Sequence, residues 1–140
     1  MFLLPGLCIT WYVTETKISD AYRIEIKNYI FARQHPVDGG WGLHIEADSS
    51  VFGTAGNYVA LRLMGADAED PRMVKARGLL HKMGGAVHGP HWLKFWLSVL
   101  GCAEWDIVNP VPPELWYVIL SSEEISRLIY CQGCFQTGFQ

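Results

Sequence analysis

The chain has 140 residues, of which 50% are hydrophobic and 13% are aromatic, enough for one core of ordinary size. With 11 basic and 14 acidic residues the net charge is -3, which removes the electrostatic basis for a nucleic-acid partner. Four scattered cysteines without a secretory signal argue against a disulfide framework and favour a reducing compartment.

The first segment, residues 1–14, is apolar and uncharged. It contains Pro5 and no basic residue, and it is shorter than the roughly 18 to 20 apolar residues that a membrane-spanning helix needs. No other window of the chain reaches that length. We therefore predict a buried helix at this end of the chain.

Two helices of different character are predicted next. In residues 19–34, Ser19 is a candidate N-cap, and Tyr22, Ile26, Tyr29 and Ile30 recur at spacings of three and four, which predicts an amphipathic helix. Residues 49–65 begin with two serines, either of which is a suitable N-cap, and end with a glycine. This second segment is apolar on most sides, so we expect it to be buried.

The same alternation follows a second time. Asp70 and Pro71 suit the N-cap and first position of a helix that ends at Gly84, and a nearly all-apolar helix then ends at Gly101. No run of alternating residues is long enough to predict a strand. The sequence therefore predicts an all-α protein.

A weak internal repeat relates the two halves. Glycine pairs at residues 39–40 and 84–85 lie 45 residues apart, and each is followed by a tryptophan, Trp41 or Trp92. Alternating amphipathic and apolar helices suit a double-layered α/α barrel, and two hairpins are fewer than a closed barrel needs. We therefore predict part of an α/α toroid, incomplete in this chain.

One stretch carries a specific resemblance. "YIFARQHPVDGGWG" resembles the QW motif of the squalene and oxidosqualene cyclases, with Gln34, Gly39 and Trp41 in the motif positions. The segments "FLLPGL", "DGGWGLHIE", "EDPRMVKAR", "LLHKMGGAVHGPHWLKFWLSVLG" and "WDIVNPVPPELW" extend the similarity. Residues 1–116 together resemble the N-terminal part of fungal oxidosqualene cyclases of the lanosterol and protostadienol synthase type.

The resemblance implies an all-α isomerase of two α/α barrels that cyclises 2,3-oxidosqualene in sterol and triterpenoid biosynthesis, without a metal or cofactor. It also implies attachment to one membrane leaflet, at the endoplasmic reticulum or a lipid droplet, without a transmembrane helix. The initiating acid of the family lies in an Asp-Cys-Thr-Ala-Glu motif, which does not occur in these 140 residues. We therefore expect a truncated form that is inactive alone and has no catalytic residue, and we expect this fragment itself to be cytoplasmic.

The resemblance also implies residue roles. Gln34 and Trp41 are expected to tie the end of one helix to the start of the next, and Gly39 to supply the turn between them. Trp92, in "PHWLKFW", is expected to contact substrate in the cyclisation cavity; a core tryptophan is the alternative. Four other aromatic residues are expected in the core without a functional role: Phe95, Trp96, Trp105 and Trp116.

Three patterns suggest metal or redox chemistry only superficially. "DAED" at residues 67–70 lacks the paired leading Asp of magnesium-binding terpene synthases, and its last Asp serves as a helix cap. His88 and His91 flank a Gly-Pro pair, which is typical of a surface turn, and no second ligand pair follows. Cys131 and Cys134 form a single Cys-x-x-Cys without a second pair or a βα context. We predict no metal site.

Two departures from the family accompany the resemblance. Gly56 stands where the family usually has an apolar residue such as Leu, and glycine inside a helix costs about 1 kcal/mol relative to alanine. Residues 117–140 do not resemble the family, and the abrupt change after Trp116 is what a retained intron, a frameshift or a misplaced exon boundary produces. We expect this tail to be mistranslated or intron-derived sequence.

Two other interpretations are open. The first is a stand-alone α-helical interaction module without catalysis, which docks through exposed apolar faces. A different α/α toroid, such as a prenyltransferase subunit, shares the helix-hairpin plan, but the absence of a zinc-ligand constellation and the length of the cyclase match count against it.

Overall fold

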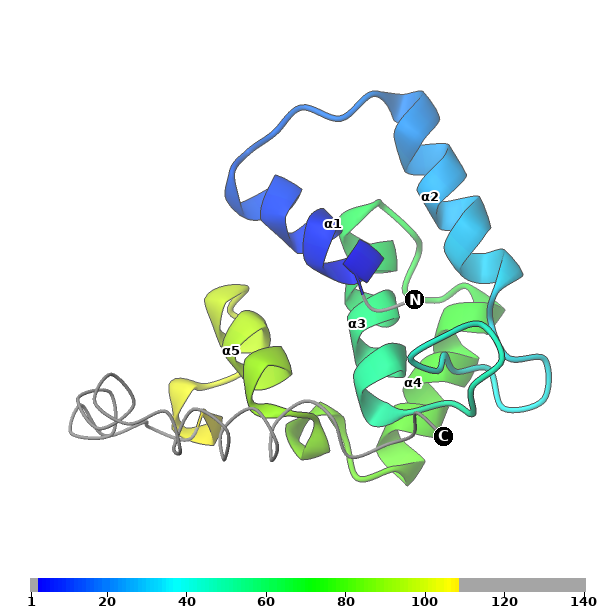
Figure 1. The fold of residues 1–140 in the computed structure, drawn as a ribbon, viewed down its shortest axis with the longest axis vertical. Helices are drawn as coiled ribbons and strands as arrows, with labels where there is room; N and C mark the ends of the chain where they lie inside the picture. The colour runs from blue at the N-terminus through cyan, green and yellow to red at the C-terminus, as the bar shows by residue number, and fades with distance from the viewer. Residues whose placement is uncertain (1–2, 109–140) are drawn as a thin grey trace, which may run out of the picture. The chain divides into compact units, whose positions relative to one another are not determined.

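A computed structural model describes residues 3–108, and these residues form helices and turns without a strand. Figure 1 shows the arrangement. The expectation of an all-α fold is confirmed for this part of the chain. Trp116, Cys131, Cys134 and the predicted boundary after residue 116 lie outside the described residues. The elements are α1 (Leu3–Val13), α2 (Asp20–Ala32), α3 (Val51–Leu63), α4 (Pro71–Lys82), the 3-10 turn η1 (Ala86–His88), α5 (His91–Val99) and the 3-10 turn η2 (Trp105–Ile107).

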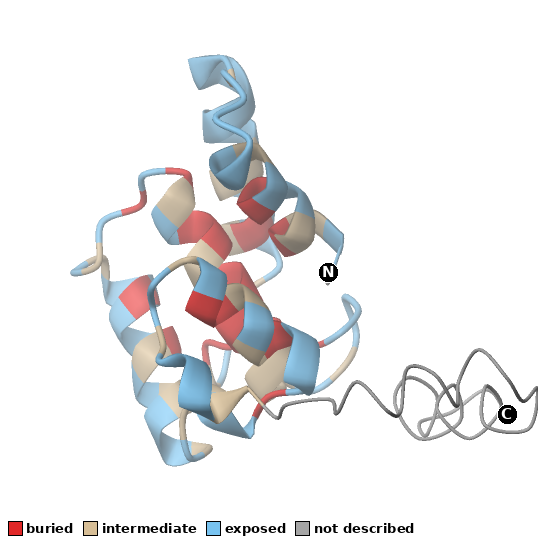
Figure 2. Ribbon diagram, turned by 90° about the vertical axis from the view of Figure 1, so that its left-hand side faces the viewer, coloured by how far each residue is buried: buried red, intermediate tan, exposed pale blue. Residues whose placement is uncertain are grey.

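Helix α3 lies at the centre, with α1 and α4 packed against it (Figure 1). Small residues give α3 its central place, because Gly53, Ala55, Gly56 and Ala60 let neighbouring backbones approach closely. The buried residues gather on α3 and on the sides of the helices that face it (Figure 2). The prediction that this helix is buried is confirmed.

The predicted helix boundaries follow from local capping. The Ser19 and Ser50 hydroxyls accept hydrogen bonds from the backbone at the starts of α2 and α3, so Ser50 rather than Ser49 caps α3. Asp70 accepts the backbone N–H of Arg72 at 2.9 Å at the start of α4. Gly65, which follows the end of α3, has φ +81°, the left-handed conformation that glycine tolerates best.

The burial predicted for the first helix is wrong for most of its surface. Only Pro5, Cys8 and Ile9 are buried, and they face α3. Leu3 is 74% exposed and Tyr12 60% exposed, because no element within residues 3–108 covers their side of α1. The sequence did not indicate which side packs, since α1 is apolar all round. Burial raises the pKa of the Cys8 thiol to about 11.

The prediction of a buried apolar face on α2 is confirmed for its isoleucines and wrong for its tyrosines. Ile30 is fully buried and Ile26 is partly buried against the core, as expected. Tyr22 is 67% exposed and Tyr29 is also exposed, which contradicts the prediction. The reason is that α2 stands at the edge of the bundle, with its C-terminal end nearest α3 and α4 (Figure 1).

Two apolar clusters hold the helices together. We call the larger one the main core, and the smaller one, which joins α3 to α5, the α5 cluster. The buried residues of the main core are Cys8, Ile30, Trp41, Ala60, Leu61, Met64, Ala66, Met73 and Ala76. The α5 cluster consists of Ala55, Leu93 and Leu97, with Phe52, Val59, Leu80, Ala86 and Ala103 packed against it.

Candidate functional site

The loop between α2 and α3 forms a tight corner. His35 donates its backbone N–H to Gly40 O at 2.9 Å and accepts the N–H of Gly39 at 2.9 Å. Gly39 has φ +79°, and a Cβ on it would lie 2.6 Å from Cγ of Lys75. Both the backbone conformation and the space therefore require glycine at this position.

Gln34 connects this corner to the start of α4. Its side-chain Nε2 donates to Gly39 O at 2.7 Å and to Arg72 O at 2.9 Å. The two N–H groups of this one amide thus bond to two carbonyls that are 33 residues apart in sequence. The arrangement fixes the corner against the first turn of α4.

Trp41 connects the corner to α2 and α3. Its side chain is 1% exposed, and its indole Nε1 donates to Ile30 O at 2.8 Å. Its backbone N–H donates to Thr54 Oγ1 at 3.1 Å, within the first turn of α3. A side chain at Gly53 would collide with Trp41 O, so α3 begins directly against the tryptophan backbone.

Arg72 is a contact residue that the sequence patterns did not reveal. Its guanidinium carbon lies 3.6 Å from the centre of the Phe31 ring, and its Nε and Nη2 donate to Asp70 at 3.0 and 2.8 Å. These bonds lower the pKa of the Asp70 carboxyl and raise that of the guanidinium. The available signal was "DPR" at a helix start, but its partner Phe31 is distant in sequence.

Asp38 orders the turn of the corner. Its Oδ1 accepts the backbone N–H of Gly40 at 2.9 Å and the hydroxyl of Ser49 at 2.7 Å, and His35 Nδ1 lies 3.2 Å away. Burial alone would raise the pKa of Asp38, but these hydrogen bonds and the nearby imidazole lower it overall. The carboxylate is therefore the form that the folded corner favours.

Trp92, the candidate substrate contact, lies on the first turn of α5. It is 40% exposed, and its ring centroid lies 4.3 Å from that of Phe52 on α3, at an interplanar angle of 56°. It belongs to α5 and not to the loop between α2 and α3 that holds Gln34, Gly39 and Trp41. Substrate contact by Trp92 stays a prediction.

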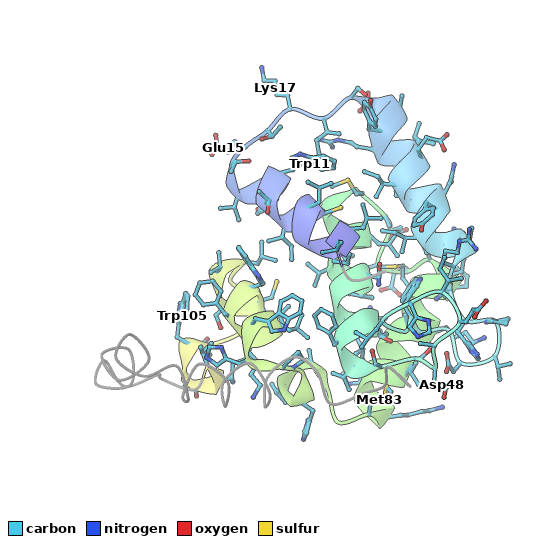
Figure 3. All side chains as sticks on the ribbon, viewed as in Figure 1. Trp11, Glu15, Lys17, Asp48, Met83 and Trp105 are labelled. Atoms are coloured by element: carbon cyan, nitrogen blue, oxygen red, sulfur yellow. The ribbon has the colours of Figure 1, made fainter. Side chains whose placement is uncertain are left out.

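The expectation of a core position is wrong for two of the other aromatic residues. Phe95 is 40% exposed and Trp105 is 57% exposed, and Figure 3 shows Trp105 at the outer edge beside α5. Their rings meet edge to face, with centroids 5.9 Å apart, and Phe95 also contacts Trp96 in this way. They are exposed because no element within residues 3–108 packs over this face of α5.

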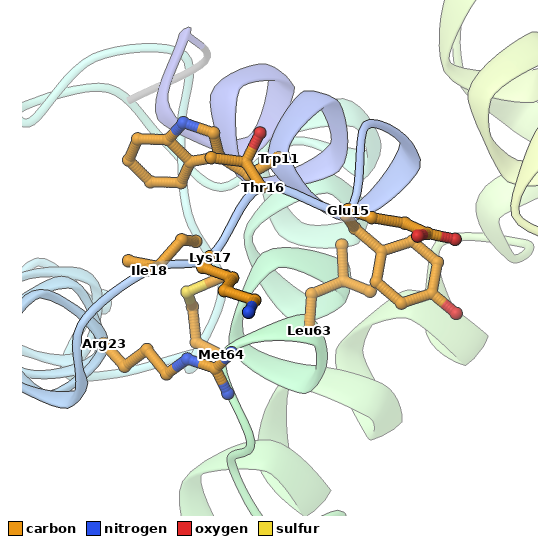
Figure 4. A pocket seen from close by; sticks show the side chains of 9 residues that line it. Trp11, Glu15, Thr16, Lys17, Ile18, Arg23, Leu63 and Met64 are labelled. Carbon is orange, nitrogen blue, oxygen red and sulfur yellow. The ribbon is translucent and has the colours of Figure 1, made fainter.

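A hollow of about 290 Å³ lies at the end of α1, the start of α2 and the end of α3 (Figure 4). Trp11, Ile18, Leu63 and Met64 give it apolar walls, and further residues of the same hollow carry charges: Glu15, Lys17 and Arg23. Its volume is just below the range of about 300 to 1,000 Å³ that is typical of ligand pockets. Trp92 does not line it.

The other candidate ligand groups are engaged locally. The Asp67 carboxylate accepts the backbone N–H of Glu69 at 3.1 Å, and Asp70 caps α4. His88 Nδ1 lies 2.8 Å from Gly84 O in an exposed turn, as the Gly-Pro pattern predicted. Residues 3–108 bring no three His, Cys, Asp or Glu side chains together in a metal-binding group. None of their helices is long and apolar enough to cross a membrane.

Residues 7–122 match the family model of the squalene-hopene cyclase N-terminal domain. The chain is 75% identical over 116 residues to lanosterol synthase erg7A of Aspergillus fumigatus, and 68% identical over the same length to lanosterol synthase ERG7 of Gibberella zeae. It is 58% identical over 116 residues to the terpene cyclase/mutase ntnI of a Nectria species.

Each of these matches covers 83% of this chain and 15% or 16% of the relative. The chain therefore spans about one sixth of the length of these relatives. The family match covers most of the described helices, including the corner that holds Gln34, Gly39 and Trp41. The chain belongs to the squalene cyclase family, and residues 7–122 carry its N-terminal domain.

Proposed function

We propose that this chain serves sterol or triterpene biosynthesis as a segment of an oxidosqualene cyclase of the lanosterol synthase type, acting on 2,3-oxidosqualene. The observation that carries the proposal is the 75% identity to lanosterol synthase erg7A of Aspergillus fumigatus over 116 residues. Relatives named lanosterol synthase in two fungi and a fungal terpene cyclase/mutase support the same class of activity.

Within such an enzyme, this segment contributes structure and one wall of the cavity. Gln34, Gly39 and Trp41 join three helices, and their hydrogen bonds support a structural role in the QW motif. Trp92 is the proposed substrate contact, because its half-exposed ring offers a π-face that stabilises a nearby cation by about 0.5 to 2 kcal/mol. Opening an epoxide also needs an acid, which we assign to no residue of this chain.

The membrane location is part of the same proposal. We place the complete enzyme on one leaflet of the endoplasmic reticulum or of a lipid droplet, with no metal and no cofactor in the reaction. We retain residue 116 as the boundary of the cyclase-like segment, although the family match runs to residue 122. Sequencing the transcript across the codons for Trp116 and Tyr117 tests that boundary, and an uninterrupted mature message would contradict an artefact there.

A chimera tests the proposed function. We define the erg7A chimera as lanosterol synthase erg7A of Aspergillus fumigatus in which the 116 matched residues are replaced by those of this chain. The purified chimera is incubated with 2,3-oxidosqualene, and the triterpene products are separated and identified by mass. We expect lanosterol. A folded chimera that forms no cyclised product would contradict the proposal.

The interaction module is the second candidate function. Exposed apolar side chains on two helices favour it, since Leu3 is 74% exposed and Phe95 and Trp105 form an exposed aromatic pair. The 140-residue chain alone, incubated with 2,3-oxidosqualene, is expected to give no more product than an empty-vector control. A monodisperse and helical chain would favour the module only where the erg7A chimera is also inactive.

A further inference from the structure

Phe52 is the aromatic partner of Trp92. The two ring centroids lie 4.3 Å apart with the planes inclined by 56°, and Phe52 is the described ring that contacts Trp92. Trp92 is the second residue of α5, whose N-cap, Pro90, makes no side-chain capping bond. The start of α5 therefore lacks a side-chain cap, and the ring contact supplies a constraint at that place.

Phe52 itself is held by the corner. It is the second residue of α3, whose first turn is capped by the Ser50 hydroxyl, 3.0 Å from Gly53 N. Ser50 also donates its backbone N–H to Trp41 O at 3.1 Å, and Thr54 Oγ1 accepts the N–H of Trp41 at 3.1 Å. Phe52 thus projects from a turn that is bonded on both sides to the buried tryptophan of the corner.

We propose that Phe52 is a positioning residue, which holds the indole of Trp92 in the orientation that presents its face to the substrate. The inference rests on the proposed function of Trp92. An aromatic contact of this kind favours one arrangement of a side chain by about 2- to 13-fold. A half-exposed tryptophan without it samples several rotamers, whereas Phe52 selects one of them.

Orientation matters because an aromatic ring is not electrostatically uniform. The face of the ring carries partial negative charge and attracts a cation, whereas its edge carries partial positive charge. If the indole of Trp92 changes to another rotamer, its edge replaces its face toward the substrate. Loss of a cation–π contact corresponds to a rate loss of about 2- to 30-fold.

The contact is tested first in the 140-residue chain. Tryptophan is replaced biosynthetically by 5-fluorotryptophan, and the ¹⁹F resonance of residue 92 among the six tryptophans is assigned by its loss in Trp92→Phe. Phe52→Leu is expected to shift this resonance, and Phe52→Tyr is expected to leave it nearly in place because the ring is kept. Tyr58→Leu is the control, since it removes a half-buried ring of α3 that packs on the main core instead.

The consequence is tested in the erg7A chimera with the same variants. Phe52→Leu is expected to lower kcat by about 2- to 30-fold and to raise the share of incompletely cyclised products. Phe52→Tyr is expected to restore both. Tyr58→Leu is expected to leave the product ratio unchanged, even where it lowers the melting temperature as much as Phe52→Leu does.

Each outcome decides the inference. An unshifted ¹⁹F resonance in Phe52→Leu overturns the contact, and a shifted resonance with unchanged kcat and products overturns the positioning role. If Phe52→Leu and Tyr58→Leu change the product ratio equally, the change is explained by lost stability alone. That result also overturns the positioning role. An unsubstituted erg7A chimera without product overturns the proposed function, and the role of Phe52 with it, even where the ¹⁹F shift confirms the contact.

Discussion

The indole Nε1 of Trp41 donates a hydrogen bond of 2.8 Å to the carbonyl of Ile30, and both side chains are buried. Ile30 lies in the last turn of α2, and its carbonyl also accepts the backbone N–H of Arg33, the C-cap residue, at 3.1 Å. The indole is therefore a second and shorter donor to this carbonyl, and it ties the end of α2 to the segment that leads into α3. It makes the corner a joint between two helices.

Replacing Trp41 by phenylalanine removes this bond and keeps an aromatic ring in the core. We expect Trp41→Phe to lower the free energy of unfolding by about 1 to 3 kcal/mol, because the Ile30 carbonyl keeps only the longer bond from Arg33 N–H and the smaller ring leaves a cavity. Urea unfolding followed by circular dichroism measures it. Trp105→Phe, at an exposed ring, is the control and is expected to change stability by less than about 0.5 kcal/mol. Equal effects would contradict the role assigned to the bond.

Two glycines offer a matched test of the turn. Gly39→Ala is expected to destabilise the chain by about 1 to 3 kcal/mol, because φ is +79° and the Lys75 side chain occupies the space of a Cβ. Gly78→Ala, in α4 with no atom near the new methyl group, is expected to stabilise it by about 0.5 to 1 kcal/mol. Thermal unfolding of both variants is the measurement. The same sign for both would refute the conformational argument.

Gly56 determines how closely α1 approaches α3. A Cβ at this position would lie 3.4 Å from Cβ of Pro5, which is ordinary contact. Gly56→Ala is therefore expected to raise the free energy of unfolding by up to about 1 kcal/mol through helix propensity. Gly56→Leu, which introduces an apolar residue of the kind that the resemblance implies here, is expected to lower it by about 1 to 3 kcal/mol, since the larger side chain needs the space of Pro5. A stabilising Gly56→Leu would show that α1 moves away without loss.

The lowered pKa of Asp38 predicts that the free energy of unfolding falls in acid. Its pKa in the folded corner lies below the ordinary value of an aspartate, so the carboxylate stabilises the fold above that ordinary value, and the contribution disappears as the pH falls through the folded pKa. Asp38→Asn keeps the two acceptor bonds but removes the charge. We expect the variant to be less stable than the parent at pH 6, by about 0.5 kcal/mol or less after solvent screening. This difference in the free energy of unfolding is expected to shrink as the pH falls from about 4 to 2. Urea unfolding of both proteins at each pH measures the difference. A difference that stays constant with pH would exclude the charge as its cause.

Local chemistry explains which parts of the fold the sequence predicted. Ser19, Asp70 and Gly84 act through backbone groups within a few residues, so capping rules located the helix ends. The buried side of α1 was not predictable, because its apolar residues surround the helix and only the position of α3 selects Cys8 and Ile9. Helix boundaries are local properties, whereas burial depends on neighbours.

The candidate site divides in the same way. Trp41 and Trp92 each follow a glycine pair, yet Trp41 is buried and hydrogen-bonded whereas Trp92 is half exposed. The spacing predicted a repeat and did not reveal this difference. The contacts of Arg72 with Phe31 and of Phe52 with Trp92 join residues about 40 apart, and they became visible only once the helices were placed in space.

The yield of lanosterol from the erg7A chimera tests the central claim most directly. The matched control carries the corresponding segment of lanosterol synthase ERG7 of Gibberella zeae in the same host, and each yield is measured against unmodified erg7A and normalised to folded protein. We expect the chimera with this chain to form lanosterol at a level comparable with the control. Lanosterol from the control alone, with an equally folded but inactive chimera, would contradict the assignment of this segment to a functional cyclase.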